Sequence, residues 1–122
     1  MPNRKQGGYH KRRPKYNATK VRTAYGTFDS KHEYERYVEL KGMQEQGIIS
    51  DLETQVPYIL VPKSVDRNGK VIERAARYYA DFRYIDSNGN CVVEDAKGVR
   101  TPEYVLKRKI MLWRYGIQIK EV

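Results

Sequence analysis

The chain has 122 residues, of which 39% are hydrophobic and 32% are charged, and its formal net charge is +9. This length predicts one domain with a single modest core, and the composition excludes a fully disordered chain. No apolar run of about 18 residues and no secretory signal are found, so neither a membrane-spanning helix nor export is expected. One cysteine and two histidines exclude a disulfide framework and a Cys/His zinc cluster, so the sequence favours a reducing, cytoplasmic setting.

The positive charge is concentrated near the N-terminus. Residues 1–22 contain no acidic residue and eight basic ones: Arg4, Lys5, Lys11, Arg12, Arg13, Lys15, Lys20 and Arg22. The other 100 residues carry 16 basic and 15 acidic groups, which nearly cancel. We therefore expect residues 1–27 to form a flexible basic arm that contacts nucleic acid, and residues 28–122 to form the folded domain. The alternative is a tail that only aids solubility. A membrane surface is not expected, because the arm has no apolar helical face.

The first predicted helix spans residues 30–46. Ser30 is a good N-cap, Glu33 stands at capping-box spacing from it, and Gly47 is a natural stop. A β-rich run then covers residues 55–61, in which Pro57 favours an edge strand.

A hairpin and a second helix follow. Residues 66–70 read as a turn, residues 76–86 as a strand with many aromatic residues, and residues 91–97 as the returning strand after a Ser-Asn-Gly-Asn turn. Thr101 caps a helix that has Pro102 at its first position and ends at Gly116, and residues 117–122 form a short strand.

The predicted order is therefore helix, three strands, helix, strand. The first three strands suit a meander, and the last strand joins the sheet after a helical crossover. This pattern predicts an α/β or α+β fold with a central mixed sheet flanked by helices.

The central hairpin carries the candidate catalytic residues. Asp95 and Lys97 are two apart in one strand, so they share a face at a spacing of about 7 Å. A three-residue loop over residues 87–89 would set Asp81 opposite Asp95, whereas a two-residue loop would place Asp81 on the face of Glu94. Both registers are open, and we favour the first because it brings two acids and a lysine together.

Two carboxylates at such a distance destabilise the fold unless a positive charge lies between them. Carboxylate oxygens suit Mg²⁺ or Mn²⁺, which can acidify a bound water for attack on a phosphodiester. Lys97 would orient that water or offset developing negative charge. We expect the third acid to be Glu33 of the first helix, with Glu35 as the alternative, although Glu33 also fits a purely capping role.

Structural explanations compete with each of these assignments. The spacing alone suits a solvated cross-strand charge cluster as well as a metal site. Glu94 is expected to be a surface strand residue paired with Arg83 or Arg74. Lys107 of the second helix either touches the scissile or adjacent phosphate or only complements the helix dipole.

The element order and these acids resemble the PD-(D/E)XK nuclease superfamily, whose core has the order α-β-β-β-α-β. The family's sheet acid matches Asp81, its acid-x-lysine matches residues 95–97, and its helix acid matches Glu33. Residues 28–55 and 79–122 look most like small phage and prophage endonucleases. Two departures are that Ala80 stands where the family has proline, and that Asp95 replaces the commoner glutamate.

The resemblance implies hydrolysis of DNA phosphodiester bonds by water activated at one or two Mg²⁺ or Mn²⁺ ions. The implied metal ligands are Asp81, Asp95, Glu33 and the backbone carbonyl of Ala96, with Gln55 either near the site or in a strand-edge hydrogen bond. Relatives include Holliday-junction resolvases, so branched DNA in phage recombination or replication is the favoured substrate, acted on in the bacterial cytoplasm. Symmetric cutting of a junction implies a homodimer. The alternative is a non-catalytic, basic nucleic-acid-binding module.

Overall fold

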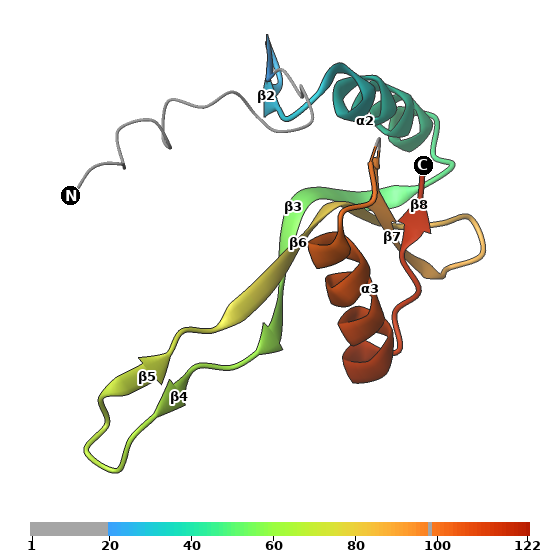
Figure 1. Cartoon of the computed structure of the whole chain (residues 1–122). Helices are drawn as coiled ribbons and strands as arrows, with labels where there is room; N and C mark the ends of the chain where they lie inside the picture. Colours follow the sequence, from blue (N-terminus) through green and yellow to red (C-terminus); the bar gives the residue numbers. More distant parts are fainter. Residues whose placement is uncertain (1–19, 98) are drawn as a thin grey trace, which may run out of the picture.

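A mixed four-stranded sheet is the centre of this α+β protein, whose computed structural model describes residues 20–97 and 99–122 (Figure 1). The strands, in sheet order, are β3 (Ser50–Val61), β6 (Ala76–Ile85), β7 (Cys91–Asp95) and β8 (Lys120–Glu121). The first three are antiparallel and β8 runs parallel to β7. The predicted meander and crossover are confirmed, and Pro57 lies on an edge strand as expected.

Two helices accompany the sheet, α2 (Lys31–Glu45) and α3 (Pro102–Tyr115). Both predicted N-caps are confirmed, because Ser30 Oγ accepts the backbone N–H of Glu33 and Thr101 Oγ1 accepts that of Tyr104, each at 3.1 Å. Helix α3 ends at Gly116 with φ +67°, a left-handed conformation that glycine adopts without strain. Neither helix of the described chain is long and apolar enough to cross a membrane.

Two small ribbons interrupt the predicted order of elements. They are β1 (Val21–Thr23) with β2 (Gly26–Phe28), and β4 (Ser64–Val65) with β5 (Val71–Glu73). The first ribbon begins at Val21 and ends at Phe28, so regular structure starts within residues 1–27, which were expected to form a flexible arm. The remaining basic residues of the arm lie outside the described residues: Arg4, Lys5, Lys11, Arg12, Arg13 and Lys15.

Two hydrophobic clusters meet along strand β6. Tyr78 and Ala80 belong to a cluster that includes Met111 of α3, whereas Phe82 and Tyr84 belong to one that includes Leu40 of α2. Fully burying side chains of this size contributes about 1.5–3 kcal/mol each. Asp81, between Ala80 and Phe82, therefore lies where the sheet changes from one cluster to the other.

The hairpin between β6 and β7 has the register that we favoured from the sequence. Phe82 pairs with Glu94 and Tyr84 with Val92, and the backbone N–H of Asp86 donates to the carbonyl of Asn90 at 2.8 Å. This is the three-residue loop. Continuing the ladder by one residue sets Asp81 opposite Asp95.

Candidate active site

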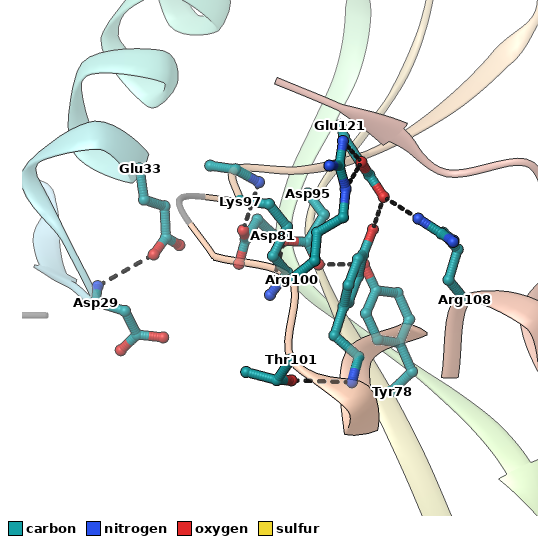
Figure 2. A network of polar contacts seen from close by, with 12 residues as sticks. Asp29, Glu33, Tyr78, Asp81, Asp95, Lys97, Arg100, Thr101, Arg108 and Glu121 are labelled. Atoms are coloured by element: carbon teal, nitrogen blue, oxygen red, sulfur yellow. Dashed lines mark hydrogen bonds and ion pairs between the residues drawn. The ribbon is translucent and has the colours of Figure 1, made fainter. Parts of the chain in front are cut away.

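Three carboxylates come together between the sheet and the first turn of α2. Asp81 and Asp95 come from β6 and β7, and Figure 2 shows the Glu33 side chain extending from α2 toward these strands. Gln55 Nε2 on β3 donates to Glu33 Oε2 at 3.0 Å and to Asp81 Oδ1 at 3.2 Å. The carboxylates of Glu33 and Asp81 therefore lie on either side of one amide group.

The local electrostatics raise the pKa of Asp81 and of Glu33. Burial, together with the charges of Asp95 and Glu33, raises the pKa of Asp81 to about 7. Burial is also the main cause that raises the pKa of Glu33, with smaller contributions from Asp29 and Asp95. A group of carboxylates held this way gains stability from a bound cation, because the cation favours their charged forms.

Asp95 has one carboxylate oxygen without a hydrogen-bond donor. Its Oδ2 accepts the hydroxyl of Tyr78 at 2.5 Å, but Oδ1 is buried and receives no hydrogen bond from the described residues. Oδ1 does lie 3.2 Å from Nζ of Lys97, which offsets its charge. An oxygen held by an ion pair alone still has a lone pair that can bind a cation.

The amine of Lys97 has two partners in the site. It forms the ion pair with Asp95 and lies 4.3 Å from the centre of the Tyr104 ring, within cation–π distance. The side chain of Lys97 remains 28% exposed. Strand β7 ends at Asp95, so Lys97 lies just beyond the strand rather than within it as predicted, and its amine still contacts Asp95.

Gln55 has an unusual backbone. Its φ is +51°, in the left-handed region that non-glycine residues rarely adopt and that costs about 1–3 kcal/mol. The paired residues Thr54 and Val56 flank it in the ladder with β6. No glycine or asparagine at this position predicts such a conformation. The side chain of Gln55 contacts Glu33 and Asp81, so it belongs to the site.

The structure also separates the two candidate helix acids. Glu33 is 4% exposed and contacts the site, whereas Glu35 is exposed. Glu33 also helps to order the start of the helix, but its Oε1 accepts the backbone N–H of Asp29, the residue before the N-cap, at 3.1 Å rather than that of Ser30. One side chain therefore orders the start of the helix and contacts the site.

The other predicted binding residues have varied surroundings. The backbone N–H of Ala96 donates to Asp81 Oδ2 at 2.8 Å, which fixes that carboxylate. Lys107 lines the site but also pairs with Glu103 at 3.0 Å. At the edge of the predicted arm, Lys20 pairs with Asp29 at 2.9 Å and Arg22 is exposed.

The site opens into a hollow of about 410 Å³. Its walls include Asp29, Gln55, Asp81, Asp95, Lys97 and Lys107. No three acidic, histidine or cysteine side chains in the described part of the chain already form a cage for a metal ion. Because the Gln55 amide stands between Glu33 and Asp81, a cation held by both would take the place of that amide. The donor set of three carboxylates, in which one oxygen receives no hydrogen bond from residues 20–97 and 99–122, fits Mg²⁺ or Mn²⁺.

The prediction that Glu94 is a surface residue is wrong. Glu94 is 0% exposed and accepts hydrogen bonds from Arg36 Nε at 2.8 Å, Arg36 Nη2 at 2.7 Å and the hydroxyl of Tyr84. It pairs with Phe82 in the ladder, and that residue packs in the cluster beside α2. Arg36, one turn after Glu33, therefore ties the helix to the strand that carries Asp95.

A fourth acid near the site is fully compensated. Glu121 pairs with Asp95 in the parallel ladder, but Arg100, Tyr104 and Arg108 donate to it at 2.6, 2.7 and 3.0 Å (Figure 2). These hydrogen bonds, with that of Arg100 the largest, lower the pKa of Glu121 to about 2. Glu121 therefore stays ionised and holds Arg100, Tyr104 and Arg108 in place beside the site.

Two tyrosines belong to the site without any sequence pattern that marks them. Tyr78 is buried, and its hydroxyl contacts Asp95. The ring of Tyr104 contacts Lys97, and its hydroxyl contacts Glu121. These contacts depend on how α3 crosses the sheet, which no sequence pattern reports.

Fold and site together define an α+β protein in which three carboxylates and a lysine meet between the sheet and the first turn of α2. A family model described as "Protein of unknown function (DUF1064)" matches residues 13–121, and the chain belongs to this family. No curated protein and no solved structure matches the chain.

Proposed function

We propose that this chain is a divalent-metal-dependent endonuclease that hydrolyses DNA phosphodiester bonds and is related to the PD-(D/E)XK nucleases. The observation that carries the proposal is the group formed by Glu33, Asp81 and Asp95 beside Lys97. One buried Asp95 oxygen in this group receives no hydrogen bond from the described residues and has only the ion pair with Lys97. A structural carboxylate would be expected to have a donor for each oxygen and a lowered pKa, as Glu121 has, whereas the pKa of Asp81 is raised.

In this proposal Asp81, Asp95 and Glu33 hold Mg²⁺ or Mn²⁺, together with the backbone carbonyl of Ala96. The bound metal supplies a water of lowered pKa and polarises the phosphoryl group. Lys97, oriented by Asp95 and by the Tyr104 ring, donates a hydrogen bond to the attacking water or to a phosphate oxygen.

The remaining residues of the site orient these groups. Tyr78 fixes one oxygen of Asp95, and the backbone N–H of Ala96 fixes one oxygen of Asp81. Lys107, on the wall of the hollow, contacts the phosphate next to the cleaved one. The favoured substrate is branched DNA in phage recombination, and this preference rests only on the resemblance to junction resolvases. Symmetric cutting of a junction would require a homodimer.

The test is incubation of the full chain with linear duplex, single-stranded and four-way-junction DNA, with and without Mg²⁺ or Mn²⁺. We expect metal-dependent cleavage by the wild type and by Glu35→Gln, a matched control on the same helix that is exposed. Asp81→Asn and Lys97→Ala should lose cleavage while still binding DNA in EDTA. Binding without any metal-dependent cleavage would overturn the proposal and leave the non-catalytic nucleic-acid-binding module.

A further inference from the structure

A long β-ribbon leaves the sheet on the strands that carry the candidate site. We define the ribbon arm as residues 62–77, which include β4, β5 and the start of β6. Figure 1 shows it projecting away from both helices, as a continuation of β3 and β6. Gln55 lies on β3 and Asp81 on β6, so the arm and the site share the same pair of strands.

The ribbon arm holds the whole positive excess of the described fold. It has two acidic residues and five basic ones, all five exposed: Lys63, Arg67, Lys70, Arg74 and Arg77. In the rest of the described chain the basic and acidic residues are equal in number, 13 of each. One of the arm's two acids, Asp66, shapes the tip, because its Oδ1 accepts the backbone N–H groups of Asn68 and Lys70 at 2.8 and 3.0 Å.

Exposed aliphatic side chains alternate with these charges. Val65 is 47% exposed, Val71 46% and Ile72 62%. A two-stranded ribbon is marginally stable in water by itself, so a surface of this kind gains stability from a partner. Basic side chains combined with methyl groups suit a duplex, in which phosphates and thymine methyl groups border the major groove.

We infer that the ribbon arm lies against duplex DNA that flanks the cleaved phosphodiester, an inference that rests on the proposed function. A B-DNA major groove about 12 Å wide admits a two-stranded ribbon. Ile72 is nine residues from Asp81, which spans up to about 30 Å at ~3.3 Å per residue, or roughly nine base pairs. The arm therefore reaches about one helical turn from the site.

The charge of the arm argues against a second copy of this chain as its partner. A two-fold contact between two arms would bring the same five basic side chains together on both sides, and like charges across an interface are unfavourable. A polyanion has the complementary charge.

The test compares two triple variants of the full chain that lose the same charge. Arg67→Gln, Lys70→Gln and Arg74→Gln change the arm, and Lys31→Gln, Lys109→Gln and Lys120→Gln change exposed positions elsewhere. Binding to a duplex of roughly 30 base pairs, three helical turns long, is followed by fluorescence anisotropy in EDTA over a range of salt concentrations. We expect the arm variant to lose about three units of the slope of log K against log salt, for every DNA sequence tested. The control should lose less than one unit.

Equal slopes for wild type and arm variant, or equal losses in both triple variants, would overturn the inference. A second variant, Val65→Ser with Ile72→Ser, keeps the charge and tests the protein-contact alternative. If it dissociates a wild-type dimer without weakening DNA binding, the arm is a surface between copies of the chain. Cleavage by the wild type is measured separately. If the arm variant loses binding but the wild type shows no metal-dependent cleavage, the result contradicts the proposed function and not the binding of DNA by the ribbon arm.

Discussion

Two neighbouring acids on β7 have opposite environments. Glu94 is 0% exposed, and Arg36 and Tyr84 donate hydrogen bonds to both of its oxygens. Asp95 is 2% exposed, but one of its oxygens has no donor among the described residues. Successive residues of a strand point to opposite faces, so Glu94 meets α2 and Asp95 meets Asp81.

The difference separates a structural carboxylate from one available for chemistry. The guanidinium of Arg36 on α2 compensates the charge of Glu94, so this ion pair helps to hold α2 against the sheet. Asp95 shares its surroundings with two other acids and a single lysine, so acidic groups outnumber basic ones there. Burial alone therefore does not mark a functional acid, whereas burial with incomplete compensation does.

The largest expected effect comes from Asp95→Asn. We expect phosphodiester cleavage to fall at least about a hundredfold, equivalent to ~2.7 kcal/mol of barrier, because the amide is a poor ligand for a hard cation. The folded structure should persist, since the asparagine oxygen still accepts the Tyr78 hydroxyl. Steady-state cleavage and circular dichroism measure the two quantities. Glu94→Gln is the matched neighbour, and it should cleave normally at temperatures where it remains folded.

The second prediction concerns the compensated acid. Arg36→Met should lower the free energy of unfolding by about 3–5 kcal/mol, because it leaves a buried carboxylate without its partner. Urea unfolding measures the loss. The double variant Arg36→Met with Glu94→Leu should recover much of it, since an apolar pair of similar volume replaces the ion pair. No recovery in the double variant would show that shape rather than charge dominates at this position.

The third prediction is a pH dependence. A carboxyl group whose pKa rises from 3.8 to about 7 on folding binds its proton more tightly in the folded chain, as Asp81 does. Without divalent cations, the melting temperature should therefore fall from about pH 5 to about pH 8. Asp81→Asn should flatten this decline. A wild-type melting temperature that rises across this range would contradict the electrostatic description of the site.

The smallest expected effect is at Gln55. Gln55→Gly relieves the strain of φ +51° but removes the hydrogen bonds to Glu33 and Asp81, so stability should change by only about 1 kcal/mol. Gln55→Ala loses the hydrogen bonds and keeps the strain, so it should be less stable than Gln55→Gly. Thermal unfolding of the two variants compares them directly, and equal stabilities would mean that strain is not stored there.

Local signals predicted much of this fold. The caps at Ser30 and Thr101, the edge position of Pro57 and the three-residue hairpin loop follow from short-range chemistry, and the structure has each of them. The register in turn placed Asp81 opposite Asp95. These features depend on residues a few positions apart, which a single sequence displays.

What the sequence did not predict depends on contacts between distant segments. Glu94 was expected at the surface because a glutamate in a strand is usually exposed, and only the crossing of α2 brings Arg36 to it. The left-handed backbone at Gln55 was not predicted, because the residue there is neither glycine nor asparagine. The strands of the ribbon arm were not predicted either, because Val65, Val71 and Ile72 show no alternation toward a core.

The most direct test of the central claim is a titration of the protein with Mn²⁺, followed by electron paramagnetic resonance of the free ion. The wild type should bind Mn²⁺ saturably, Asp95→Asn should lose that binding, and Glu35→Gln should retain it. A wild-type chain that binds no Mn²⁺, or an Asp95→Asn variant that binds it as the wild type does, would contradict the assignment of Asp81, Asp95 and Glu33 as a metal site.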